Sequence, residues 1–300
     1  MSVSTGSSRR ALETGPSGWL AAPALIFFLL FAIIPLFGVL FLSFTTWDGL
    51  GDIKLDGLSS WTTVLTDPLT GNALLVTAKI MFFSFIVQAP ISLLLGVFTA
   101  AGQKYRAALA VLYFVPLLLS SAAAAIAFKA LLDPNFGMGA GLGLPLLAQD
   151  WLGNSDLVLF VVVFVIAWQF VPFHTLIYQG GVRQIPVSLY EAAQIDGAGR
   201  IQQFFSITLP QLKYTIITST TLMVVGSLAY FDLVFVLTGG GPGYATRLLP
   251  LHMYLTGFKA NDMGAASALG VILVVIGLAL ALLLQRLGGK NRDDSQMEGA

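Results

Sequence analysis

The sequence predicts an all-α polytopic membrane protein, with six transmembrane helices and a cytoplasmic helical hairpin between the fourth and the fifth. The chain is 56% hydrophobic and 10% charged, whereas soluble domains carry about 25% charged residues. Six apolar segments are each long enough to cross about 30 Å of hydrocarbon as a helix rising about 1.5 Å per residue. The most polar long segment, residues 186–210, separates the fourth apolar segment from the fifth.

The six apolar segments cover residues 19–45, 72–101, 107–132, 157–179, 212–238 and 264–287. Prolines occur inside four of them, and neighbouring helices must re-satisfy the carbonyls that these prolines leave free, which indicates a packed bundle. We interpret residues 18–288 as one membrane domain, and residues 1–17 and 289–300 as polar cytoplasmic tails.

The distribution of basic residues predicts that both ends of the chain are cytoplasmic. With the N-terminus inside, ten basic residues fall on the inner side: Arg9, Arg10, Lys104, Arg106, Arg183, Arg200, Lys213, Arg286, Lys290 and Arg292. The remaining five fall outside: Lys54, Lys79, Lys129, Arg247 and Lys259. The excess of Lys and Arg on cytoplasmic segments sets the orientation of membrane proteins, so residues 180–211 are expected in the cytoplasm.

The polar segment has the signals of two short helices. Ser188 and Glu191 form S-x-x-E, which predicts a capping box at the start of the first helix. Gly197 follows, and glycine adopts the left-handed conformation that closes a helix at little cost. A second helix is expected from Ala198 to about Thr208, with Pro210 marking the start of the fifth span.

The same segment carries a spaced motif, E-A-A-x-x-D-G-A-x5-F-x-x-I-x-L-P. Its fixed positions are Glu191, Ala192, Ala193, Asp196, Gly197, Ala198, Phe204, Ile207, Leu209 and Pro210. This resembles the EAA loop of the permease subunits of bacterial ABC importers. The flanking segments "RQIPVSLYEAA" and "LTGGGPGYATRLLPLHMY" are similar to the carbohydrate branch of that family, the maltose and glycerol-phosphate permease types.

The resemblance implies a permease of the bacterial cytoplasmic membrane, whose EAA loop is a coupling helix seated in a groove of a cytoplasmic ATPase dimer. Glu191 would make polar contacts there, Gly197 would permit the turn, and Ala192 and Ala193 would fit the groove. The other implied partners are a second EAA-loop permease, an extracytoplasmic solute-binding protein or lipoprotein, and a carbohydrate. This chain lacks G-x-x-x-x-G-K-[ST], so ATP and magnesium are expected only in the ATPase subunits, with no cofactor and no catalysis here. The alternative is an amphipathic loop lying on lipid.

Polar residues at membrane depth are candidates for the substrate path. Asp232 is the only carboxylate well inside a predicted span, and Tyr230 and Phe231 beside it have rings that stack on sugars. For Asp232, sugar binding and helix–helix hydrogen bonding stay open. For Gln88 and Gln169, also substrate-path candidates, helix–helix hydrogen bonding is favoured.

The other polar features of the spans and the outer side favour structural roles. His174 is expected to be a packing or interfacial histidine near the inner end of the fourth span. Gly239–Pro242 is expected to be an external turn, and residues 246–258 a short interfacial helix that also belongs to the surface where a binding protein docks.

Other functional classes fit less well. A secondary, ion-coupled transporter is the main alternative, but it usually needs intramembrane acids and often repeated halves. The sequence contains no hydrolase or metalloprotease motif and no filter sequence, which argues against an enzyme and a channel. The net charge is zero and there is no cysteine, so neither nucleic acid nor thiolate chemistry is indicated.

Overall fold

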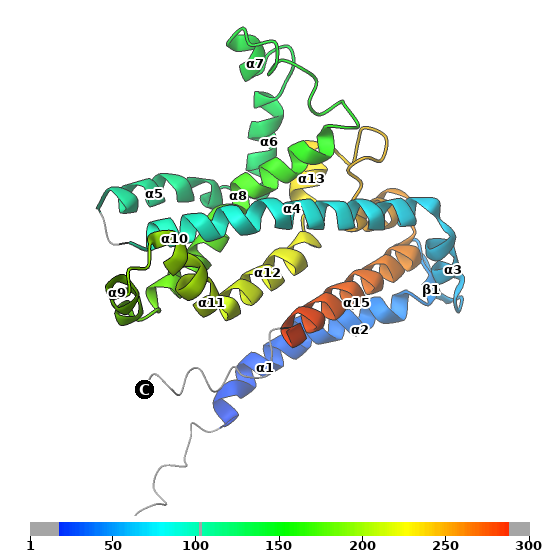
Figure 1. The fold of residues 1–300 in the computed structure, drawn as a ribbon. Helices are drawn as coiled ribbons and strands as arrows, with labels where there is room; N and C mark the ends of the chain where they lie inside the picture. The colour runs from blue at the N-terminus through cyan, green and yellow to red at the C-terminus, as the bar shows by residue number, and fades with distance from the viewer. Residues whose placement is uncertain (1–17, 102–103, 288–300) are drawn as a thin grey trace, which may run out of the picture.

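The computed structural model describes residues 18–101 and 104–287 as a helical bundle with one small β-hairpin (Figure 1). The two predicted tails, residues 1–17 and 289–300, lie outside the described residues. The β-hairpin pairs β1 (Thr45–Thr46) with β2 (Lys54–Leu55) in antiparallel register. It follows the first span, next to α3 (Ser59–Thr66).

The first span is one continuous helical rod, Trp19–Leu42, none of which is buried inside this chain. It consists of η1 (Gly18–Ala21), α1 (Ala22–Phe28), the π turn η2 (Leu29–Ile33) and α2 (Ile34–Leu42). The π turn ends two residues before Pro35, where the Ile34 amide donates to the Leu29 carbonyl. A wider turn at this point accommodates a residue that has no N–H to donate. The rod packs on α15 (Met263–Leu287).

The centre of the bundle is a pair of long helices, α4 (Pro68–Ala100) and α8 (Val158–Arg183). The 33 residues of α4 make a rod of about 50 Å. Near its inner end a Cβ on Gly96 would lie 2.5 Å from the Cβ of Tyr178 on α8. One turn further on, Gln179 Nε2 donates to the Thr99 carbonyl at 2.9 Å. The two helices are therefore in close backbone contact at this end.

Two of the predicted spans are bent pairs of helices rather than straight helices. Residues 107–132 form α5 (Lys104–Leu118) and α6 (Ser121–Leu131), with a bend of 103° between them. Residues 212–238 form α12 (Lys213–Ser227) and α13 (Phe231–Leu237), bent by 49°. In the described residues four helices are long and apolar enough to cross a membrane, or up to six if each bent pair counts as one span. Hydropathy did not reveal the bends because both arms of each pair are apolar.

The shorter elements of the described fold are α7 (Met138–Gly141), α14 (Leu249–Tyr254) and the π turn η4 (Leu255–Lys259). The prediction of an interfacial helix here is partly wrong, because α14 buries Leu249 and Leu251 completely against its neighbours. Its first turn is held by Thr77 of α4, whose hydroxyl oxygen accepts from the Leu249 amide at 2.9 Å. Gly239 and Gly240, at the predicted external turn, both have positive φ.

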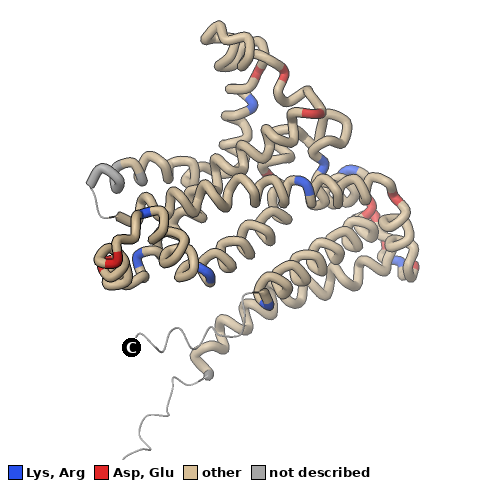
Figure 2. Tube along the Cα trace, in the orientation of Figure 1, with Lys and Arg blue, Asp and Glu red and all other residues tan. Residues whose placement is uncertain are grey.

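Charged residues lie mainly near the ends of the helices and in the segments that connect them (Figure 2). These regions are the segment between α8 and α12, the region of β1 and α3, and the arm that contains α6 and α7. The long helices between these regions carry few charges, as expected for segments that face hydrocarbon.

Candidate functional site

The segment predicted as a coupling hairpin is a helical hairpin at the end of α8. It consists of α9 (Val187–Ile195), α10 (Arg200–Gln203), the π turn η3 (Phe204–Thr208) and α11 (Leu209–Gln211). The second helical arm therefore begins two residues later than predicted and runs through Pro210. As in the first span, a π turn precedes the proline, and the Leu209 amide donates to the Phe204 carbonyl.

Gly197 closes α9 in the manner that the sequence predicts. Its φ is +79°. The Gly197 amide donates to the Gln194 carbonyl at 3.0 Å, and the Ala198 amide donates to the Ala193 carbonyl at 2.8 Å. These two bonds form a Schellman motif, which satisfies the last carbonyls of the helix. A Cβ on Gly197 would meet no atom within 4 Å, so its backbone conformation, rather than crowding, requires glycine here.

The predicted capping box is wrong. The helix begins at Val187 with Pro186 at the N-cap, and no side chain caps it. Ser188 therefore lies inside the first turn, where its hydroxyl is out of register for the S-x-x-E arrangement. The residue before the first helical position is proline, whose fixed φ already suits the start of a helix.

The two arms of the hairpin are tied to each other and to the bundle. The Tyr190 hydroxyl on α9 lies 2.9 Å from Thr208 Oγ1, and Gln203 Nε2 donates to the Ala198 carbonyl at 2.8 Å. At the base, a Cβ on Gly181 would lie 2.8 Å from a methyl group of the buried Leu212. The hairpin thus continues α8 as a stiff element.

The motif residues lie mainly on the outside of this hairpin. Five of them are exposed, namely Glu191, Ala192, Asp196, Gly197 and Pro210. The other five are half-buried, namely Ala193, Ala198, Phe204, Ile207 and Leu209. Two further apolar side chains near the tip are strongly exposed, Ile195 at 87% and Ile201 at 77%. Exposed apolar side chains gathered in this way indicate a surface that contacts another protein or a membrane.

A cavity of about 360 Å³ lies where the two bent helix pairs meet α8. The α5–α6 arms contribute Leu117 and Ser121, and the region of the α12–α13 bend contributes Tyr230 and Asp232. Phe170 of α8 packs its ring 5.3 Å from the ring of Tyr230. The Asp232 side chain is exposed and forms no ion pair or hydrogen bond with the described residues. The cavity therefore combines aromatic rings with a free carboxylate, which suits a polyhydroxylated ligand.

Three other predicted substrate-path residues do not line this cavity. Gln88 is completely buried on α4. Gln169 Nε2 donates to the Leu119 carbonyl at 3.0 Å, so this amide satisfies a backbone group at the α5–α6 bend. Phe231 stacks on Phe235 with ring centroids 5.3 Å apart and packs in the outer aromatic cluster with Tyr254. This hydrogen bond agrees with the structural role that the sequence favoured for Gln169.

His174 also lines the cavity, although a packing or interfacial role was the favoured interpretation of this candidate from the sequence. It is 3% exposed, and its Nδ1 lies 3.0 Å from Ser219 Oγ on α12. The bend beside it was missed too, although Ser120 provided a signal. Its hydroxyl oxygen accepts from the Ala123 amide at 3.2 Å and caps α6, and serine is a preferred residue at helix starts.

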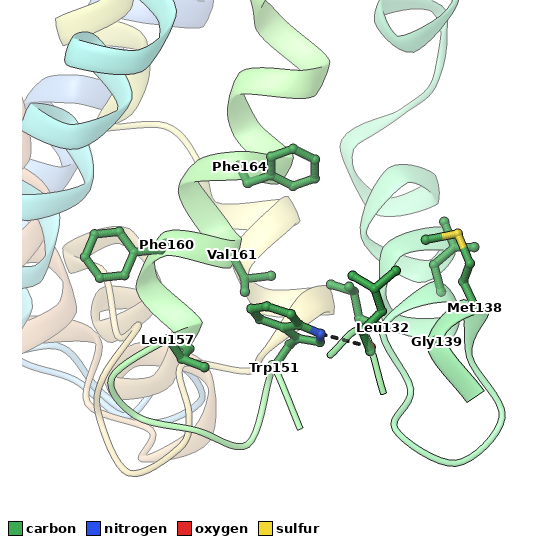
Figure 3. A pocket seen from close by; sticks show the side chains of 10 residues that line it. Leu132, Met138, Gly139, Trp151, Leu157, Phe160, Val161 and Phe164 are labelled. Atoms are coloured by element: carbon green, nitrogen blue, oxygen red, sulfur yellow. Dashed lines mark hydrogen bonds between the residues drawn. The ribbon is translucent and has the colours of Figure 1, made fainter. Parts of the chain in front are cut away.

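A second cavity, of about 280 Å³, lies between α6, α7 and the start of α8 (Figure 3). Its walls are apolar, with Leu132, Met138 and Phe164 around the indole of Trp151. The indole N–H already donates to the Leu147 carbonyl at 3.1 Å. This cavity offers no free polar group to a sugar. The described residues contain no group of three or more His, Cys, Asp or Glu that could hold a metal.

A polar cluster at the outer end joins α14 to the start of α4. His252 Nε2 lies 3.4 Å from Asp67 Oδ2 and 3.3 Å from Thr70 Oγ1. Asp67 also caps α4 by accepting from the Leu69 amide. Burial lowers the pKa of His252, the nearby charge of Arg247 lowers it further, and Asp67 opposes both. His252 is thus held mainly neutral as a structural link.

A bundle with up to six membrane-crossing helices, a cavity between bent helices and a stiff hairpin at one end has the architecture of a membrane transport subunit. Residues 92–292 match the family described as "Binding-protein-dependent transport system inner membrane component". This match covers about two thirds of the chain, and the chain belongs to this family. It is therefore the non-catalytic, multi-pass inner-membrane component of an ABC importer. Such a component works with a binding protein, an ATPase and a partner permease, and it binds no cofactor itself.

Relatives cover nearly the whole chain. The probable ABC transporter permease protein YurN of Bacillus subtilis is 34% identical over 268 residues, covering 87% of this chain and 91% of that protein. The arabinooligosaccharides transport system permease protein AraP of the same organism is 30% identical over 273 residues, with 89% and 87% covered. A chain from the crystal structure of a bacterial ABC transporter involved in the import of the acidic polysaccharide alginate superposes with a TM-score of 0.79. That chain is 22% identical, and the match covers 92% of this chain and 97% of that one, which confirms the fold.

Proposed function

We propose that this permease imports a carbohydrate and that the hairpin of residues 186–211 transmits the motion of the ATPase to the transport path. The single observation that carries the coupling role is the hairpin itself. A Gly197-closed tip exposes Ile195 and Glu191, while the base is fixed to the end of α8. A rigid element of this kind passes on a displacement without absorbing it.

In this proposal the motif residues form the surface that the ATPase contacts. Glu191 supplies polar contacts, Ala192 and Ala193 fit a groove, and Gly197 sets the turn. The remaining positions that support this surface are Asp196, Ala198, Phe204, Leu209 and Pro210.

The proposed substrate path runs through the cavity beside the bends, with Asp232 accepting hydrogen bonds from sugar hydroxyls and Tyr230 packing on a sugar ring. The chemistry of that cavity supports a polyol ligand, because carboxylates and aromatic faces both bind sugars well. Relatives whose names specify arabinooligosaccharides and multiple sugars point to the same class of substrate. The partner permease in this proposal is a different chain, and the binding protein is an extracytoplasmic lipoprotein that docks at the outer end.

The orientation in this proposal places residues 1–17, 289–300 and the hairpin in the cytoplasm, with residues 18–288 as the membrane domain. The ten-to-five distribution of basic residues between the two sides supports it.

The test is ATP-driven uptake by the complete transporter in proteoliposomes. We expect carbohydrate-loaded binding protein to stimulate ATP hydrolysis and uptake together, and an ionophore to leave uptake unchanged. Uptake that continues without ATP and stops with the ionophore would refute the proposal in favour of ion coupling. Cysteine labelling at Ile195 from one side of the membrane would test the orientation separately.

A further inference from the structure

A third cavity lies behind the hairpin, between its two arms and the inner ends of α4 and α8. Its volume is about 500 Å³. Its lining includes apolar residues, among them Val97 and Ala100 of α4 and Val182 of α8. It also includes polar and basic side chains from α8, α9, α10 and η3: Arg183, Tyr190, Arg200, Gln203 and Thr208. We refer to it as the inner cavity.

Two arginines from distant parts of the hairpin meet in the inner cavity. Arg183 is the last residue of α8 and Arg200 is the first residue of α10. Both side chains are exposed, and neither forms an ion pair or a hydrogen bond with any residue in the described ranges. The hairpin's own carboxylates, Glu191 and Asp196, are not among the residues that line the cavity.

The simplest alternative assigns each arginine a local role. A cation in the last turn of α8 stabilises the helix dipole, which accounts for Arg183. It does not account for Arg200 of the four-residue helix α10, which is exposed and has no ionic partner among the described residues. Two unpaired cations that line one cavity, with no carboxylate in its lining, make that cavity a candidate site for an anion.

We propose that the inner cavity binds the phosphate of a phosphate ester, and that its occupant is the headgroup of an anionic phospholipid of the inner leaflet. Guanidinium groups bind phosphate oxygens in a bidentate manner. Basic pockets between membrane helices at the cytoplasmic side are suited to anionic headgroups. The apolar residues Val97, Ala100 and Val182 supply the surface that the glycerol and first acyl carbons of a lipid require. A soluble anion does not need an apolar surface.

The bound headgroup touches both the fixed ends of the long helices and the arms of the hairpin. It therefore braces the element proposed to couple transport to ATP hydrolysis, and it makes coupling depend on anionic lipid. The choice of the inner leaflet rests on the orientation given under the proposed function. Lipid binding itself does not require ATP hydrolysis, so it is measured independently of transport.

The experiment compares lipid retention by the complete, purified transporter using native mass spectrometry. Wild type and the double variant Arg183→Gln/Arg200→Gln are mixed with dioleoyl phosphatidylglycerol or dioleoyl phosphatidylcholine. We expect wild type to retain phosphatidylglycerol preferentially, and each arginine removed to weaken that retention about fivefold. Arg183→Lys/Arg200→Lys should keep part of the preference, because lysine preserves charge but not the bidentate geometry.

The matched control is Lys213→Gln, which removes an exposed cation from the inner side without touching the cavity. It should leave retention unchanged. Equal retention by the double variant, or equal loss in the Lys213 control, overturns the proposal. Inorganic phosphate and glucose 6-phosphate form the second arm. Arginine-dependent binding of either, without binding of phosphatidylglycerol, assigns the cavity to a soluble phosphate ester and overturns the lipid assignment.

A last measurement separates lipid binding from subunit assembly. Co-purification of the ATPase and the partner permease with the double variant is expected to be unchanged. Loss of the ATPase with retention of phosphatidylglycerol means that the arginines pair with a carboxylate of the ATPase, which also overturns the proposal.

Discussion

Replacing Gly197 by valine should uncouple ATP hydrolysis from uptake. Gly197 closes α9 with φ +79°. An L-residue in the left-handed region is penalised by about 1–2 kcal/mol, and a β-branched residue is among the least tolerant. A penalty of about 2 kcal/mol changes the equilibrium between the native turn and an alternative backbone conformation by about 30-fold, in favour of the alternative. Alanine should have a smaller effect, about fivefold to tenfold.

The chain provides a matched control two residues away. Gly199 lies in the same turn with φ −70° and ψ 165°, an extended conformation that valine adopts readily. A Cβ at either glycine would meet no atom within 4 Å, so crowding does not distinguish them. Gly199 is the N-cap of α10, where valine is a poorer cap by about 1 kcal/mol or less, so Gly199→Val should keep uptake within about fivefold of wild type.

The assay measures uptake and ATP hydrolysis by the same proteoliposomes containing the complete transporter. We expect Gly197→Val to lower uptake by at least about tenfold while the subunits remain assembled, consistent with a penalty of at least 1.4 kcal/mol. If the Gly197 and Gly199 variants transport equally well, the hairpin does not need its closed tip and the coupling argument is wrong.

Three further predictions concern single side chains. Glu191→Ala should weaken co-purification of the ATPase, while capture of substrate by the binding protein is unchanged; loss of substrate capture would contradict the assignment. Asp232→Asn should raise the substrate concentration for half-maximal uptake by about tenfold, because a charge-assisted hydrogen bond contributes about 1.5–3 kcal/mol; an unchanged value would remove Asp232 from the substrate path. The third concerns His252, whose pKa is lowered in the folded protein. The unfolded chain therefore binds protons more readily, and stability present above about pH 6.5 should be lost as the pH falls through the folded-state pKa. A thermal melting temperature that drops equally on acidification in wild type and His252→Asn would contradict this.

The sequence predicted the membrane fold and the hairpin because both depend on local patterns. Long apolar runs indicate segments that lie in lipid, and a glycine after a helical pattern, such as Gly197, indicates a left-handed turn. The bends at Leu119 and at Ala229 were not predicted, because they depend on which helix satisfies the freed backbone groups. At the first bend this is Gln169, fifty residues away in sequence.

The candidate site was predicted in part for the same reason. Tyr230 and Asp232 line the cavity, but Phe231 between them does not, since successive residues of a helix point in different directions. His174 was undervalued because its position relative to the cavity follows from the bends. The capping box failed because S-x-x-E also fits a helix that starts one residue before the serine.

The contact of Gly96 with Tyr178 constrains how this permease changes shape. With no room for a methyl group between α4 and α8, neither helix can slide along the other without separating first. In the proposed orientation, a tilt imposed at the end of α8 that carries the hairpin is therefore passed on to α4. At the other end of α4, Thr77 and Thr70 hold α14, which moves in the same step. We therefore expect both ends of α4 to move together, as parts of one rigid body.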